Sequence, residues 1–583
     1  MANTNKLYTK YAKLLNEDAP LQEYPRPQMV RNSYLNLNGY WDYHISDSNA
    51  LPIHYDGKIL VPFPIESLLS KVYKHIKPNE YLFYRLVFVL PKKFLKDLLL
   101  LHFDAVDQKA VIFINKQRVF EHVGGYFPFT VDITPFLQEE NEIVVQVTDP
   151  SNHSFRAYGK QHTKPGGIWY TPITGIWQSV WLESVASNHI QDIIINPSFD
   201  DGLVFFQLVG INDVNGVIKI LSNKKVIVEK KIKEPIFHIL LSDFIAWTPE
   251  NPHLYQVVIE LKTDTIESYF GMRKISIGDG QFGRALFLNN EEIFLSGVLD
   301  QGYYSDGLYT PASDQAFIDD IITMKKMGYN VLRKHVKIEP RRWYYHCDRL
   351  GMLVWQDMVS GGRYSLPKMS LLPLLGIKTC DDQNKLKVFG RDQLEAQESF
   401  YEEMTNTVAL LNSNPSVIIW TIFNEGWGQF NSQKNYDFLK AFDKTRLIDA
   451  VSGWFDQGGP DFSSKHIYFK KVAFDKDTRP LVLSEFGGYT HKIPHHSYHL
   501  TKEFGYRKFT SNESLQQGIE KLYKEEIIPK IKEGLCAAIY TQLSDVEEET
   551  NGLLTYDREF IKVDSNVLKN IHQTIYSQIA KKH

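Results

Sequence analysis

The sequence predicts a multidomain fold with a jelly-roll-like β-sandwich, an immunoglobulin-like β-sandwich and a C-terminal (β/α)8 barrel. Three observations support this prediction. The chain has 583 residues, which exceeds the size of one ordinary hydrophobic core. Up to about residue 278, short alternating apolar runs are separated by turn residues, as in antiparallel sheets; beyond that point, strand-like runs alternate with helical periods. We place the domains at residues 1–187, 188–278 and 279–583.

The two N-terminal domains are predicted from their strand patterns. Runs such as LLLLHFDAV, KAVIFIN and EIVVQVTD alternate apolar and polar residues, which is typical of half-buried antiparallel strands. The second domain contains DIIINPSF, LVFFQLVG, GVIKILS and LYQVVIELKT at the regular spacing of a small immunoglobulin-like sandwich.

The third domain is predicted from its repeating strand and helix pattern. In its first helix Phe317, Ile321 and Met324 recur on one face, Ser313 is suited to cap the start and Gly328 to close the end. Eight candidate strands follow one another, as a (β/α)8 barrel requires: 293–298, 330–335, 353–357, 417–423, 448–453, 466–469, 481–485 and 537–542. Because such barrels carry their active sites at the carboxyl ends of the strands, residues at strand ends are the candidates for chemistry.

Composition excludes several classes of function. The 65 Lys and Arg residues nearly balance the 69 Asp and Glu residues without long runs of one sign, which argues against a nucleic-acid or anionic-membrane partner. The cysteines Cys347, Cys380 and Cys536 lie far apart, which argues against disulfides and structural zinc. No signal-peptide core and no apolar segment of about 18 residues is visible, so we expect a cytoplasmic location. Aromatic residues, 13% of the chain, often neighbour Gly, Pro or Asn in apparent loops, which suits stacking on sugars.

Two apolar strands end in carboxylates. The run IIWTIFNEGW presents Asn424 and Glu425, and RPLVLSEFGGY presents Glu485. On a barrel rim these carboxylates would converge, and the reaction that needs two facing carboxylates is glycoside hydrolysis. A single glutamate at a strand end could equally form a salt bridge; the pair, with Asn424 beside it, favours chemistry.

These segments carry a resemblance to a known family. NPSVIIWTIFNEGWG and LVLSEFGG resemble the acid/base and nucleophile segments of glycoside hydrolase family 2, the family of β-galactosidases, β-glucuronidases and β-mannosidases. TGIWQSVWLE, WTPENPHLY and GYNVLRKHVKIEPRRWYYHCDRLGMLVWQDM resemble further family segments in the same order along the chain. The resemblance implies that Glu425 is the general acid/base, that Glu485 is the nucleophile and that Asn424 holds the 2-hydroxyl of the sugar.

Strands two and three supply the next candidates. The nucleophile must stay ionised, and Arg333 is the cation expected to favour that state. His335 lies two residues further along, so both side chains face the same way, and the resemblance implies that His335 lines the sugar subsite. Asp357 ends the third strand and either contacts the sugar or binds Arg333. Trp420 and Trp427 are expected to form apolar walls beside Glu425.

Four further rim residues are predicted substrate contacts. Trp454 and Tyr468 end strands five and six, Tyr468 resembles a tyrosine that hydrogen-bonds the nucleophile, and His466 faces the same way. Tyr540 stands where many relatives carry a tryptophan under the sugar ring. An aromatic residue at a strand end is otherwise an ordinary core residue.

Two segments suggest other roles. The run HKIPHHSYH (491–499) contains four histidines, but Pro494 indicates a loop, so we expect no catalytic metal site and no cofactor. A magnesium or sodium ion, which some family members bind near the site, stays open. The long connection 360–391 is apolar for a surface loop, and we expect it to wall the pocket or to form a subunit contact.

The predicted substrate is a small-molecule or oligosaccharide β-hexoside. Family β-glucuronidases carry an Asn-x-Lys motif that binds the sugar carboxylate, and DVEEETNGLLTYDR (545–558) lacks such a lysine. A neutral β-galactoside cleaved with retention is therefore our first choice. The alternatives are another specificity within the family, a non-catalytic carbohydrate-binding protein and a metal-dependent hydrolase that uses the histidine run. No nucleic-acid or membrane partner is expected, and a homo-oligomer is possible.

Overall fold

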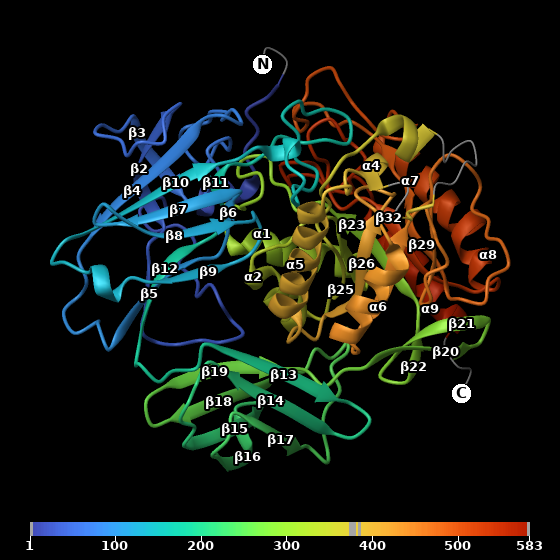
Figure 1. Cartoon of the computed structure of the whole chain (residues 1–583). Helices are drawn as coiled ribbons and strands as arrows, with labels where there is room; N and C mark the ends of the chain where they lie inside the picture. The colour runs from blue at the N-terminus through green and yellow to red at the C-terminus, as the bar shows by residue number, and fades with distance from the viewer. Residues whose placement is uncertain (1–3, 372–379, 383–385, 580–583) are drawn as a thin grey trace.

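The computed structural model describes residues 4–371, 380–382 and 386–579. Eight parallel strands form one sheet in the C-terminal part of the chain, in the order β27-β26-β25-β24-β23-β32-β29-β28 (Figure 1). The strands are β23 (Leu295–Asp300), β24 (Val331–Lys334), β25 (Leu353–Asp357), β26 (Val417–Asn424), β27 (Leu447–Ser452), β28 (Ser463–Ile467), β29 (Leu481–Gly487) and β32 (Leu535–Thr541). The two edge strands β27 and β28 lie in contact, so the sheet is a nearly closed barrel. The predicted barrel is confirmed.

Helices cover the outside of the barrel (Figure 1). They are α1 (Asp314–Lys326), α2 (Arg341–Leu350), α4 (Leu386–Phe389), α5 (Leu394–Leu411), α6 (Ser432–Phe442), α7 (Asn512–Leu522), α8 (Ile528–Ile531) and α9 (Ser565–Ile579). Short helical turns are η1 (Lys10–Leu14), η2 (Thr134–Phe136), η3 (Ser151–His153), η4 (Pro367–Leu371) and η6 (Tyr523–Ile527). Of these described helices, none is long and apolar enough to cross a membrane.

Helix α1 shows how local sequence sets an element. The hydroxyl of Ser313 accepts a hydrogen bond from the backbone N–H of Gln315, which satisfies a donor that the first turn leaves free. Phe317, Ile321 and Met324 are buried against the barrel wall. Gly328 takes a φ of +93° just after the helix, a conformation that favours glycine.

The barrel wall separates two apolar cores because side chains alternate along each strand. In β32, Ala537 and Ile539 face the barrel interior, whereas Ala538 and Tyr540 pack with the helix layer. Whether a strand residue faces the barrel interior or the helices therefore depends on its position in this alternation.

The N-terminal domain is a sandwich of two antiparallel sheets. One has the order β1-β12-β5-β9 and the other β3-β2-β4-β10-β7-β8. Their strands are β1 (Tyr34–Asn36), β2 (Gly39–Ser46), β3 (Gly57–Val61), β4 (Tyr81–Phe88), β5 (Leu98–Phe103), β7 (Lys109–Ile114), β8 (Gln117–Val123), β9 (Phe129–Asp132), β10 (Asn141–Thr148) and β12 (Val180–Val185), with a short pair β6 (Val106–Asp107) and β11 (Gly175–Ile176). Alternate residues of β5, Leu99, Leu101 and Phe103, are buried in the common core.

The immunoglobulin-like domain has sheets β13-β14-β17 and β16-β15-β18-β19. Their strands are β13 (Asp192–Ser198), β14 (Leu203–Val209), β15 (Gly216–Ser222), β16 (Lys225–Ile232), β17 (Ile236–Leu240), β18 (Tyr255–Leu261) and β19 (Thr265–Phe270). The buried guanidinium of Arg31 pairs with Glu183 of the first sandwich at 3.0 Å and with Asp264 of this domain at 2.7 Å. This shared cation joins the two sandwiches.

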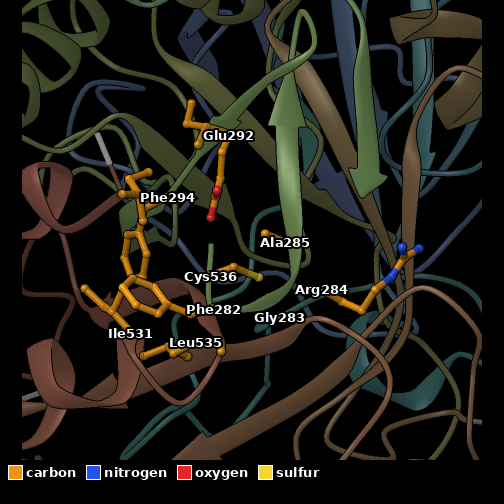
Figure 2. Close-up of a pocket in the computed structure, with 12 residues that line it drawn as sticks. Phe282, Gly283, Arg284, Ala285, Glu292, Phe294, Ile531, Leu535 and Cys536 are labelled. Carbon is orange, nitrogen blue, oxygen red and sulfur yellow. The ribbon is translucent and has the colours of Figure 1, made fainter. Parts of the chain in front are cut away.

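A small antiparallel sheet closes the amino-terminal end of the barrel. It consists of β20 (Ile275–Gly280), β21 (Gly283–Leu288) and β22 (Glu291–Ile293), so the predicted limit at residue 278 falls inside β20. Figure 2 shows a small pocket between this sheet and the barrel, lined by Phe282, Glu292 and Cys536 among others. This pocket lies at the opposite end of the strands from Glu425 and Glu485.

Residues 157–171 of the first sandwich, named here the sandwich loop, lie across the carboxyl end of the barrel. The backbone N–H groups of Tyr158 and Gly159 donate to the Ser360 carbonyl at 3.1 and 3.0 Å. At the other end of the loop, the Thr171 N–H donates to Glu547 at 2.8 Å.

A short pair of strands, β30 (Tyr489–Thr490) and β31 (Arg507–Lys508), lies in the connection that follows β29.

Glu66 provides a test of the fold through its pH dependence. Its carboxylate is buried in the first sandwich, where one oxygen accepts the Thr174 N–H at 2.9 Å, and burial raises its pKa to about 8. The folded state binds this proton more tightly than the unfolded state, so the contribution of Glu66 to stability is present below its ordinary pKa and is lost as the pH rises toward 8.

We therefore expect Glu66→Gln to stabilise the protein at pH 8 by about 4 kcal/mol and to leave stability at pH 4.5 nearly unchanged. The measurement is urea unfolding across this pH range, with the exposed Glu140→Gln as control. A pH-independent difference between wild type and Glu66→Gln would contradict the assignment.

Candidate active site

A buried arginine stands at the centre of the barrel rim. The Arg333 guanidinium makes a two-pronged contact with Asp357, with both N–O distances 3.0 Å. It also donates to Glu485 at 3.1 Å and to Asn424 and Ser452, each at 2.9 Å. Arg333 thereby connects the ends of five barrel strands, and the expectation that it neighbours Glu485 agrees with this geometry.

The two predicted catalytic carboxylates face each other. Glu425 directly follows β26, and its φ of +51° lies in the left-handed region that non-glycine residues rarely adopt. The Glu425 N–H donates to the Ser452 carbonyl at 3.0 Å, which holds the turn. A carboxylate oxygen of Glu425 and one of Glu485 lie within 4.8 Å of each other. The Glu425 side chain is 16% exposed and that of Glu485 6%, so Glu425 is the more accessible of the two.

The surroundings of Glu485 keep it ionised. Burial alone would raise its pKa, but the charges of His466, Arg333 and His335 outweigh burial, and with the hydrogen bond from Tyr468 they lower the pKa of Glu485 to about 2. At neutral pH this group is a carboxylate and therefore suited to act as a nucleophile.

His335 and Asp357 form a buried pair beside this centre. His335 Nδ1 lies 2.9 Å from Asp357 Oδ2 and 4.0 Å from Glu485 Oε1. Burial lowers the pKa of the His335 ring below its ordinary value. Both oxygens of Asp357 already accept hydrogen bonds from Arg333, and the side chain is almost fully buried. The geometry thus favours the second of the two predicted roles, in which Asp357 binds Arg333.

Strands β27 and β28 bring three further predicted residues to the rim. His466 Nδ1 lies 2.7 Å from Glu425 Oε1, and its Nε2 lies 3.5 Å from Glu485 Oε1. The Tyr468 hydroxyl donates to the second oxygen of Glu485. Trp454 and His466 make a T-shaped ring contact with centroids 5.6 Å apart, and Trp454 donates from Nε1 to the Met369 carbonyl at 2.8 Å.

The structure corrects two predicted positions. Tyr540 is buried on the helix side of β32, where its ring packs against Phe486 at 5.7 Å, so it lies outside the site. The next residue, Thr541, faces the site and lies 3.2 Å from the Tyr468 hydroxyl. Trp420 also faces the helices and donates to Asp443 at 2.9 Å, so it forms no wall beside Glu425.

The sandwich loop brings residues to the rim that the sequence analysis did not identify. The Trp169 ring makes T-shaped contacts with the rings of Trp427 and Tyr364, with ring centroids 5.1 and 4.9 Å apart. A further residue that the sequence analysis did not identify is Tyr506, in the connection after β29. Its ring stacks on that of Tyr468, with centroids 3.9 Å apart. The only signal in the sequence was the excess of aromatic residues near glycine and proline.

Lys160 of the sandwich loop adds a positive charge. It is half-buried, and Nζ lies 5.8 Å from the centre of the Trp169 ring. Burial raises the pKa of Glu549, and the charge of Lys160 opposes that rise; the same charge helps to lower the pKa of His335. Within the described part of the chain, no carboxylate forms a salt bridge with Lys160.

Two histidines of the run 491–499 contact different carboxylates. His496 pairs with Asp557 at 2.7 Å, whereas His499 lies 3.5 Å from Glu548, so the rings do not converge. Among the residues that the structure describes, the only His, Cys, Asp or Glu group close enough to hold a metal is that of Glu425, His466 and Glu485.

The predicted wall formed by 360–391 can be followed only in part, since residues 372–379 and 383–385 lie outside the described ones. In the described part, Tyr364 and the Met369 carbonyl lie at the rim, through their contacts with Trp169 and Trp454. Arg391 donates to the Gly428 carbonyl at 3.1 Å.

Three models of one family match successive parts of the chain. The model described as "Glycosyl hydrolases family 2, sugar binding domain" matches residues 32–184, "Glycosyl hydrolases family 2" matches 188–273, and "Glycosyl hydrolases family 2, TIM barrel domain" matches 282–559.

Relatives in sequence carry two names. A β-galactosidase of Thermoanaerobacter pseudethanolicus is 26% identical over 56% of this chain and 46% of its own length, and one of Priestia megaterium is 23% identical over 78% and 48%. A β-glucuronidase of Streptococcus agalactiae serotype V is 22% identical over 86% of this chain and 91% of its own. The chain thus spans less than half the length of these β-galactosidases.

Solved structures share the fold. A Bifidobacterium dentium β-glucuronidase complexed with coumarin-3-O-glucuronide has a TM-score of 0.74 at 16% identity and covers 94% of this chain and 98% of its own. A β-galacturonidase of Eisenbergiella tayi bound to galacturonate has a TM-score of 0.68 at 17% identity and covers 94% and 99%.

The central cation gives a prediction on stability and rate. In Arg333→Met, Asp357 and Glu485 lose their buried partner, which costs about 3 to 5 kcal/mol of the free energy of unfolding. We also expect hydrolysis to become undetectable, because Glu485 loses a cation that keeps it ionised. Urea unfolding and a glycosidase assay measure both effects. Arg118→Met, at a mostly exposed ion pair, is the control. A variant as stable as wild type would contradict the central role of Arg333.

Proposed function

The chain belongs to glycosyl hydrolase family 2, and on that premise we propose that it is an exo-acting β-glycosidase that retains configuration, with Glu485 as nucleophile and Glu425 as acid/base. The observation that carries this proposal is the distance between the two carboxylates, whose oxygens lie within 4.8 Å. Retaining glycosidases hold their carboxyl groups about 5 to 5.5 Å apart, whereas inverting enzymes need about 6.5 to 9.5 Å to admit water. The non-catalytic carbohydrate-binding alternative does not explain this pair.

The proposed reaction has two steps. In the first, Glu425 gives its proton to the glycosidic oxygen while a Glu485 oxygen attacks the anomeric carbon; the bond to the leaving group breaks and a glycosyl ester forms. In the second, Glu425 takes a proton from water, and the resulting hydroxide releases the sugar and frees Glu485. Tyr468 donates to Glu485 Oε2, and in this proposal Asn424 holds the 2-hydroxyl of the sugar.

A neutral β-galactoside is our first candidate substrate. The segment after β32 lacks the Asn-x-Lys motif expected for a glucuronide, and several relatives in sequence are named β-galactosidases.

A β-uronide is the second candidate, and one observation favours it. Lys160 places an ammonium group, without a salt bridge to any described carboxylate, near His335 and Glu549. Such a cation is suited to bind a carboxylate of the sugar. The names of the β-glucuronidase and β-galacturonidase relatives agree with this candidate.

The two catalytic roles are tested by distinct variants. Assayed on a panel of nitrophenyl α- and β-glycosides, Glu485→Gln should lose at least about 10⁴-fold in kcat, because no covalent intermediate can form. Glu425→Ala should keep cleaving glycosides with good leaving groups, and azide should restore turnover by giving a β-glycosyl azide.

The control is Glu395→Gln, at an exposed position on α5, which should behave as wild type. Activity surviving in Glu485→Gln would disprove the nucleophile assignment, and an α-glycosyl azide would disprove retention.

Lys160 separates the two candidate substrates. If the substrate is a β-uronide, Lys160→Gln should lower kcat/KM for the nitrophenyl β-uronides by about 10- to 100-fold, because a charge-assisted hydrogen bond is lost, and should change β-galactoside hydrolysis less than about threefold. The exposed Lys164→Gln, on the same loop, is the control. Equal rates of uronide hydrolysis in wild type and Lys160→Gln would remove the support for the β-uronide.

A further inference from the structure

His466 is placed by an irregularity in its strand. The pairing between β28 and β29 shifts register between Lys465 and His466, and this shift sets His466 opposite Glu485. Bulges of this kind re-aim a side chain and are common beside active sites. Without the shift, the alternation along β28 would give His466 a different neighbour on β29.

The imidazole stands between the two catalytic carboxylates. Its Nδ1 lies 2.7 Å from Glu425 Oε1, and its Nε2 lies 3.5 Å from Glu485 Oε1 and 3.4 Å from a nitrogen of Arg333. The side chain is fully buried, so water does not compete for these contacts. A contact of 2.7 Å between a carboxylate oxygen and a ring nitrogen holds one hydrogen, carried by either group.

The backbone at Gly453 packs closely against both partners of this contact. A Cβ atom at Gly453 would lie 3.3 Å from Glu425 Cγ and 3.3 Å from His466 Nδ1, and the φ of Gly453 is +98°. A side chain at residue 453 would therefore press on both partners, whereas glycine allows the strand end to pack beside them. The T-shaped contact with the Trp454 ring also limits the movement of the imidazole.

We propose that His466 is the positioning residue of the acid/base: it fixes the Glu425 carboxyl group against Glu485 and shares with it the single proton that passes to the leaving group. The proton leaves the Glu425–His466 pair for the glycosidic oxygen as that bond breaks, and a proton from water returns to the pair in the second step. This inference rests on the proposed function.

The charged groups around His466 come from four strands. Glu425 follows β26, Glu485 lies on β29 and Arg333 on β24, and the charge of His466 also acts on Asp449 of β27, a buried carboxyl group whose pKa is raised to about 7, chiefly by burial. A loss of activity in a His466 variant could therefore arise through any of them. Only an effect through Glu425 depends on the leaving group.

The test compares leaving groups on one glycone, the one cleaved best in the nitrophenyl panel. A 2,4-dinitrophenyl glycoside needs no acid, whereas a methyl or phenyl glycoside does. We expect His466→Phe to lower kcat/KM by about 100-fold for the phenyl glycoside and by less than about fivefold for the dinitrophenyl glycoside, since general acid catalysis contributes about 10² to 10⁴. His466→Asn, whose amide can replace the contact to Glu425, should fall between wild type and His466→Phe.

His335→Asn is the matched comparison, since His335 neighbours Glu485 and binds Asp357. It should lower kcat/KM for both leaving groups alike. Equal losses in His466→Phe would show that His466 acts through the nucleophile or the fold and would overturn the inference, as would no loss at all. Failure of the proposed function looks different: wild type would cleave no glycoside, or Glu485→Gln would stay active, and the inference would fall with it.

Discussion

The active site depends on the burial of one permanent positive charge. A guanidinium group cannot lose its proton in a protein, so the barrel must surround Arg333 with acceptors or bear a cost of several kcal/mol. Asp357 supplies two of these acceptors and Glu485 another. This division has a consequence for the reaction: when Glu485 becomes a neutral ester, Arg333 still has Asp357 as its counter-ion. Arg333 therefore keeps a counter-ion in both halves of the proposed cycle.

Much of this arrangement could be predicted from the sequence because it follows from periodicity. Apolar runs identify the barrel strands, and polar residues that end such runs must lie at the rim, as Asn424, Glu425 and Glu485 do. It is harder to predict which residues of a strand face the barrel interior and which face the helices. Tyr540 and Trp420 end or interrupt apolar runs like the true rim residues, yet both face the helices. In a strand that is buried on both faces, hydrophobicity does not distinguish the two sides.

Other parts of the site lie beyond such reasoning. His466 lies opposite Glu485 because of a register shift between β28 and β29, and no residue pattern in KHIYF indicates this shift. Lys160 and Trp169 precede the barrel by more than a hundred residues, and their position depends on how the sandwich docks. Each contact of this kind joins segments far apart in the chain, and the sequence alone does not specify how domains pack.

The sandwich loop joins the first domain to three segments at the rim of the barrel. Its backbone binds the segment after β25 at Ser360 and the segment after β32 at Glu547, and its side chains reach the segment after β26 at Trp427. The rim is thus assembled from two domains, and neither domain carries the whole of it. Recombination that exchanged the barrel alone would transfer Glu425 and Glu485 without Lys160 and Trp169. The carboxylates of the barrel and the loop residues beside them can therefore change independently, because they lie on separate domains.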